Sequence, residues 1–113
     1  MADRAFSIKE GDTSPPLFAT LLDKGSGEPI NLVGATVRFH MATEAGQVIV
    51  DEPAFVLNGG VTGGVRFDEW TEAHTATPGR YLGEFEVTFP DQDVQSFPTE
   101  RSGFPIIISA GLA

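Results

Sequence analysis

Residues 79–89, GRYLGEFEVTF, decide the fold class of this chain. From Tyr81 onward, aromatic, aliphatic or glycine positions alternate with a set that is mostly charged or polar: Tyr81, Gly83, Phe85, Val87 and Phe89 against Leu82, Glu84, Glu86 and Thr88. A period of two residues is typical of a β-strand with one buried face and one solvated face. The run is long and contains no proline, so we expect it to be a central strand whose first set points into the core.

Shorter segments of the same kind lie on both sides of this strand, separated by turn-rich sequence. Besides residues 81–89, the predicted strands are residues 5–9, 17–22, 37–41, 47–50, 54–57, 65–67, 94–97 and 105–109. Turns every 8 to 12 residues are typical of an antiparallel sandwich rather than a parallel α/β sheet. Residues 69–76 are the best helical segment, and they have room for a single turn only. The sequence therefore predicts one all-β sandwich domain of about eight or nine short strands over residues 1–113.

Composition limits the classes of partner. The chain has 113 residues, enough for one ordinary domain, with 16 acidic and 7 basic residues and a formal net charge of −9. A negative surface repels nucleic acid and anionic lipid, so we expect neither as a partner. The acidity either keeps the domain soluble or fits a basic partner. No stretch has the ~18 apolar residues of a membrane span, and no export signal is visible.

Residues for catalysis or metal binding are sparse. The chain has no cysteine, which rules out disulfides and thiolate ligands. A serine nucleophile would need a nearby base, and only His40 and His74 could serve, neither beside a nucleophile motif. Both are expected to be solvated or capping histidines. The pairs Asp51-Glu52 and Asp68-Glu69 fall on neighbouring strand positions, which face opposite ways. We therefore expect no enzyme activity, no metal and no cofactor.

Apolar residues near the C-terminus exceed what one buried face requires. The candidate interface consists of the isoleucine run, the only tryptophan and one residue of the tail: Ile106, Ile107, Ile108, Trp70 and Leu112. Two alternatives stay open. The isoleucine run can be a core strand buried on both sides, and Trp70 can cover the edge of the core.

Three longer runs, taken together, resemble a known family. They are residues 6–17 with Gly-Asp-Thr-x-Pro, residues 30–41 with Leu-x-Gly-Ala-x-Val-x-Phe, and residues 64–89 with Gly-x-Tyr-x-x-Glu-Phe-x-Val. In this order and spacing they resemble the N-terminal domain of phage baseplate upper proteins. The resemblance implies an immunoglobulin-like β-sandwich that is not an enzyme and that serves in the virion as an attachment platform.

The function expected from this resemblance is that of a phage virion structural protein, docking on the tail or baseplate. One alternative is a protein that decorates the capsid surface or anchors a head fibre. Another is a carbohydrate-binding β-sandwich. The expected partners are other phage structural proteins and further copies of the chain, located in the virion.

A homo-oligomer is also expected from the edges of the sandwich. Open edge strands in soluble proteins are usually protected by charge, proline or a partner. Several prolines could blunt some edges, but the strand at residues 36–41 carries only Arg38 and His40 outward. We therefore expect symmetric copies to assemble on the particle.

Overall fold

The computed structural model describes residues 5–99 and 103–112, which form eight β-strands and one short 3₁₀ turn. Their bounds are β1 Phe6–Lys9, β2 Leu17–Thr20, β3 Thr36–Thr43, β4 Val48–Val56, the 3₁₀ turn Asn58–Gly60, β5 Gly64–Phe67, β6 Gly79–Thr88, β7 Val94–Phe97 and β8 Phe104–Ser109. The described part contains no helix long and apolar enough to span a membrane. The prediction of a single all-β sandwich is confirmed.

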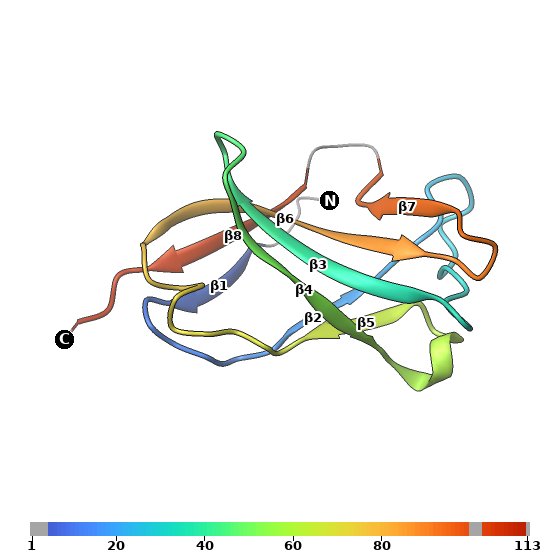
Figure 1. Ribbon diagram of the computed structural model, residues 1–113, viewed down its shortest axis with the longest axis horizontal. Helices are drawn as coiled ribbons and strands as arrows, with labels where there is room; N and C mark the ends of the chain where they lie inside the picture. Colours follow the sequence, from blue (N-terminus) through green and yellow to red (C-terminus); the bar gives the residue numbers. More distant parts are fainter. Residues whose placement is uncertain (1–4, 100–102, 113) are drawn as a thin grey trace.

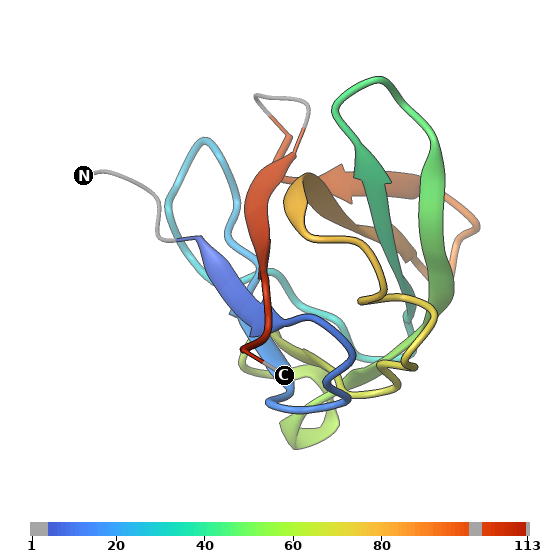
Figure 2. The same ribbon diagram turned by 90° about the vertical axis from the view of Figure 1, so that its left-hand side faces the viewer.

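The strands follow one hydrogen-bonded order, β1-β8-β6-β3-β4-β5-β2. Strand β7 pairs with the second half of β6, on the edge where β8 pairs with the first half (Figure 1). The first part of β4 pairs with β3, and its last two residues pair with β5. Strand β4 therefore belongs to both layers: a large sheet of β1, β8, β7, β6, β3 and β4, and a small sheet of β4, β5 and β2. Viewed along the long axis, the strands curl around one interior (Figure 2). All pairings are antiparallel except that of β1 with β8.

Strand β6 is central, as predicted. It pairs with β3 over residues 81–88 on one side and with β7 and β8 on the other. The predicted inward set is confirmed, because Tyr81, Gly83, Phe85 and Val87 are buried while the intervening residues are half-exposed. Before the strand, the Tyr81 hydroxyl donates a hydrogen bond to the carbonyl of Thr77 at 2.6 Å, which holds the Pro78-Gly79 reversal closed.

Three sequence predictions about single segments are wrong. Residues 47–50 and 54–57 form one strand, β4, which continues through Pro53. Proline is tolerated there because β4 is leaving β3 for β5 at that point. Strand β3 lies between β4 and β6, so it is not the open edge that residues 36–41 were expected to form. Residues 69–76 form turns and no helical turn.

Aromatic rings fill the centre of the interior. Phe39 lies 4.6 Å from Phe67, 5.3 Å from Phe85 and 5.6 Å from Trp70, measured between ring centroids. At one side of this cluster, Gly83 leaves room for its neighbours, since a Cβ there would lie 2.6 Å from the Ile106 Cδ1 atom. Burial of such rings removes a large apolar area from water for each residue.

The core also contains most of the residues that were expected to form an interface. Ile106, Ile108 and Trp70 are all at least 95% buried within this chain. They face the interior, so their assignment to an interface is wrong. Trp70 lies in the core, as its alternative predicted, whereas the isoleucine run is fully buried on one face only. Ile107 is half-buried between β1 and β6, and Leu112 is fully exposed.

Candidate functional site

A hollow of about 450 Å³ lies on the outer face of the large sheet, over β3, β4 and β6. We call it the His40 hollow. Two adjacent rows of side chains cross the three strands and form much of its lining: a polar row of Asp51, His40 and Glu84, and an apolar row of Val48, Ala42 and Leu82. Thr43, Glu44, Gly46 and Gly83 complete it. Its volume lies in the range of small-molecule sites in proteins.

The register of the strands explains why both rows exist. His40 lies directly opposite Asp51 on β4 and Glu84 on β6, and directly opposed residues share a face. Between Met41 and Ala42 the pairing shifts, so that Val48 rather than Ile49 lies opposite Ala42. This β-bulge turns Val48 outward, where it is exposed, while Ile49 packs against the core. The bulge therefore gives the hollow its apolar side.

His40 is held between two carboxylates. Its Nδ1 atom lies 3.0 Å from Glu84 Oε2, and its Nε2 atom lies 3.1 Å from Asp51 Oδ1. A neutral imidazole has one N–H, so it donates to one of these carboxylates and turns a lone pair toward the other; the imidazolium donates to both. The ring is half-buried and lies on the polar face of its strand, as the alternation predicted. The contacts with both carboxylates were not expected.

Arginine neutralises two of the three carboxylates in the hollow. The Arg38 Nε atom donates to Asp51 Oδ1 at 2.9 Å, and Arg80 Nε donates to Glu44 Oε2 at 3.3 Å. Arg38 also donates through Nη2 to the Asp51 carbonyl at 2.8 Å, which fixes the guanidinium on the sheet. The Arg38 hydrogen bond has the largest effect and lowers the pKa of Asp51; burial opposes it, and the charge of Arg38 and the contact with His40 lower this pKa further.

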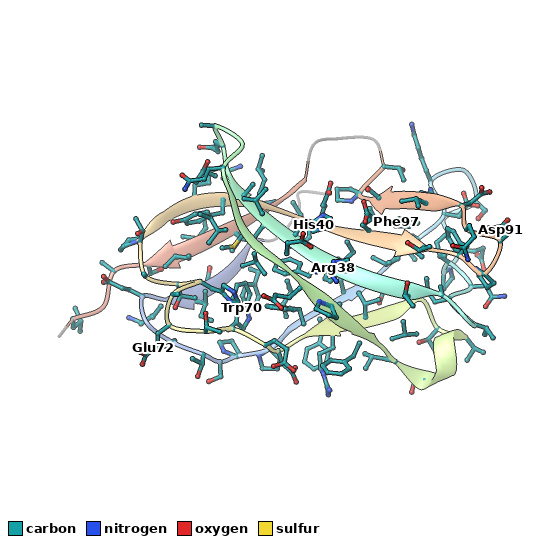
Figure 3. The ribbon with its side chains drawn as sticks, viewed as in Figure 1. Arg38, His40, Trp70, Glu72, Asp91 and Phe97 are labelled. Carbon is teal, nitrogen blue, oxygen red and sulfur yellow. The ribbon has the colours of Figure 1, made fainter. Side chains whose placement is uncertain are left out.

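Glu84 has a different environment. Among the described residues its charged contact is with His40, and no arginine or lysine lies against it. Figure 3 shows Arg38 and His40 near the middle of the molecule, with Asp91 and Glu72 toward opposite ends. The hollow therefore combines one carboxylate without an arginine partner with a wall of Val48, Ala42 and Leu82.

The polar row does not form a metal centre in this arrangement. The two ring nitrogens of His40 point toward different carboxylates, so the three side chains do not converge on a single point. Within residues 5–99 and 103–112, no three His, Cys, Asp or Glu side chains are grouped so as to hold a metal ion. A protein metal site needs at least three such ligands in most coordination geometries.

A larger hollow of about 630 Å³ lies at the far end of β6, beside the turn that joins it to β7. Val33, Val94, Asp91 and Asp93 are among its lining residues. Asp91, however, accepts a hydrogen bond from the backbone N–H of Asp93 at 3.0 Å, within its own turn. This use of a side chain is usual in turns, and Asn31, which also lines the hollow, accepts a hydrogen bond from the backbone N–H of Val33 in the same way. We therefore consider the His40 hollow the better candidate.

The second histidine has a structural role. The Thr71 backbone N–H donates to His74 Nδ1 at 3.0 Å, and the His74 N–H donates to Thr71 Oγ1 at 3.2 Å. His74 thus caps the turn after Trp70, one of the two roles expected for it. Burial lowers the pKa of His74, while the negative charge of Glu52 opposes this effect.

Sequence reasoning did not identify the His40 hollow. The sequence places His40 and Glu84 on alternating strands and Asp51 in a pair of neighbouring carboxylates, but Asp51 and Glu84 lie 11 and 44 positions from His40. Only the strand register brings them together, and a single sequence does not give the register.

Comparison with known proteins gives the fold and no family. No protein-family model matches the chain, and no curated protein matches it. A solved structure that is similar is that of CopC from Methylosinus trichosporium OB3b, with a TM-score of 0.55 and 9% sequence identity over 98% of this chain and 89% of that chain. At this identity the likeness shows a shared fold. It contradicts the predicted function, because the similar structure is that of CopC and not that of a phage structural protein. The prediction of a virion docking protein is therefore wrong, together with its alternatives.

Proposed function

We propose that this chain is a non-enzymatic binding protein whose ligand is a small organic cation with an apolar body, bound in the His40 hollow. The observation that carries the proposal is the position of Glu84: a carboxylate paired with a histidine instead of an arginine, beside the apolar row. The net charge of −9 adds a favourable long-range attraction for cations.

The polar row and the apolar row bind different parts of the ligand. A protonated amine at Glu84 gains a charge-assisted hydrogen bond and competes with the His40 ring for the same oxygen. The apolar body covers Leu82 and Val48, of which Val48 is 63% exposed without a ligand. Arg38 and Arg80 keep the neighbouring carboxylates occupied, so that the ligand's charge is directed to Glu84.

The test compares two probes of nearly the same shape and opposite charge, 2-phenylethylamine and 3-phenylpropionate, by isothermal titration calorimetry at pH 7.5. We expect the amine to bind and the acid to bind at least tenfold more weakly, which corresponds to about 1.4 kcal/mol. The Glu84→Gln variant should lose about tenfold or more in affinity for the amine, since a hydrogen bond to a charged group contributes about 1.5 to 3 kcal/mol.

Glu86→Gln is the matched control. Glu86 lies on the same strand and the same face, and its substitution removes the same charge, but it does not line the hollow. We expect it to leave the affinity within about twofold, because the long-range attraction changes little. Equal losses of affinity in the two variants would mean that net charge alone explains the effect and that Glu84 has no specific role. Equal binding of the two probes would overturn the proposal.

A further inference from the structure

The outer face of the small sheet carries a second set of exposed side chains, separate from the His40 hollow. Arg66 on β5 lies directly opposite Phe18 on β2 and Phe55 on β4. Opposed residues share a face, so the three side chains form one row across the sheet, which we call the aromatic row. Phe18 is 59% exposed and Phe55 is 45% exposed.

Contacts within the aromatic row hold it in place. The Arg66 guanidinium carbon lies 5.0 Å from the centre of the Phe55 ring, a cation–π distance. Its Nε atom lies 3.2 Å from Asp68 Oδ2 in an ion pair whose geometry is not that of an aligned hydrogen bond. Because Arg66 contacts both Asp68 and the Phe55 ring, the Phe55 ring is held against a fixed guanidinium. Such pre-ordering lowers the entropy cost of binding to this ring.

A hollow of about 440 Å³ adjoins the row at Phe55 and is lined by Glu52, Pro53, Glu69, Thr71 and His74. Asp68, Glu69 and Glu72 are exposed in the segment that follows β5. Arg66 is the only basic residue of the row, and Asp68 already pairs with it. The lowered pKa of His74 keeps its ring neutral at pH 7. The surface around the rings is therefore apolar at its centre and negative at its side.

The row also lies beside an open edge. Strand β2 ends the strand order, and in the part of the chain described here no strand pairs with its second edge. Its four residues, Leu17–Thr20, contain no proline. An extended peptide can therefore add to β2 and place an apolar side chain against Phe18.

We propose that the aromatic row and the β2 edge bind an extended basic segment of a partner protein, in which apolar residues alternate with lysine or arginine. Charge decides between this partner and a second copy of the chain. A second copy would bring Asp68, Glu69 and Glu72 together with their equivalents, and each copy carries a net charge of −9. A basic segment pairs with those carboxylates while its apolar residues cover the rings.

The experiment titrates ¹⁵N-labelled protein with a blocked nonapeptide in which Phe and Val alternate with Lys, followed by NMR. The counterpart peptide has Glu at every Lys position. We expect the Lys peptide to shift the amide signals of β2, β5 and the end of β4, and to bind more weakly as salt is added. The Glu peptide should cause no such shifts. Shifts confined to other strands, or equal binding of the two peptides, would overturn the proposal.

Three variants give the second readout. Phe18→Ala and Phe55→Ala should each weaken binding of the Lys peptide at least fivefold with little change in thermal stability, because the two residues are 59% and 45% exposed. Val94→Ala is the matched control, since Val94 is 58% exposed and lies on β7, away from the small sheet. An equal loss in Val94→Ala would overturn the assignment. Sedimentation that shows self-association lost in Phe18→Ala would assign the row to a second copy instead.

Discussion

The two faces of β6 differ in how tightly their side chains are packed and therefore in which substitutions they tolerate. The inner face, with Tyr81, Gly83, Phe85 and Val87, is packed on all sides and tolerates neither lost nor added volume. The outer face, with Leu82, Glu84 and Glu86, is half-exposed, and its contacts are with cross-strand neighbours. The difference suggests that the inner face determines stability, while the outer face is free to carry chemistry.

The largest effect is expected for Phe85→Ala. Phe85 is 1% exposed and packs against the Phe39 and Phe104 rings. Its removal should cost about 3 to 5 kcal/mol in the free energy of unfolding, the range for large-to-small core substitutions. Urea denaturation measures it, and a loss below about 1 kcal/mol would contradict the packing of the inner face.

An added methyl group on the same face should cost less. In Gly83→Ala the new Cβ would lie 2.6 Å from Ile106 Cδ1 and 2.8 Å from a Phe104 ring carbon. Both are side-chain ends that can shift, so we expect a loss of about 1 to 3 kcal/mol, typical of overpacking. The control is Gly111→Ala, where a Cβ meets no atom within 4 Å. If both variants unfolded at the same denaturant concentration, the close approach at Gly83 would be refuted.

A smaller, pH-dependent effect is expected at the turn after Trp70. Burial lowers the pKa of His74 in the folded protein below its ordinary value of 6.5. The neutral form is thus favoured by folding, and its contribution to stability is complete above pH 6.5 and declines as the pH falls below that value. Protonation also removes the acceptor for the Thr71 N–H.

Thermal unfolding between pH 7.5 and pH 5 measures this effect. The wild-type protein should lose more stability over this range than a His74→Gln variant does. A larger loss in the variant would mean that His74 binds a proton more readily after folding.

The smallest effect on stability is expected for Glu84→Ala, on the outer face of the strand that also carries Phe85. Glu84 is half-exposed, and its contact with His40 is a surface ion pair of the kind that contributes about 0 to 1 kcal/mol. We expect a loss below about 0.5 kcal/mol, measured by the same urea denaturation. A loss as large as that of Phe85→Ala would show that the two faces have been assigned incorrectly.

The sequence predicted the inner face well and the outer face poorly, for a physical reason. Burial of one face makes apolar residues alternate with polar ones within a single strand, as Tyr81, Phe85 and Val87 do in β6. The sequence of that strand is therefore enough to recognise its inner face. The polar row of Asp51, His40 and Glu84 takes one residue from each of three paired strands. No single strand therefore contains a sequence pattern that reveals it. The isoleucine run was ambiguous for a related reason. Ile106 and Ile108 are buried on one face of β8, and Ile107 is half-buried on the other, so the run itself shows no polar face.

The resemblance to phage baseplate proteins gave the correct fold class and the wrong function. The residues behind it are mostly those that a sandwich needs at its turns and inner faces, such as Gly34, Phe39 and Tyr81. These positions are determined by the fold, and one fold can carry many functions. Of the outer rows, on which we base both proposals, Glu84 is the one residue that the three motifs name.

The most direct test of the proposed function is to locate bound 2-phenylethylamine by NMR. Intermolecular nuclear Overhauser effects between its phenyl protons and the methyl groups of Leu82 and Val48 would place the ligand in the His40 hollow. We predict these contacts, and we predict their loss in Glu84→Gln at the same ligand concentration. Contacts with Val33 and Val94 instead would place the ligand in the hollow at the far end of β6 and would contradict the account.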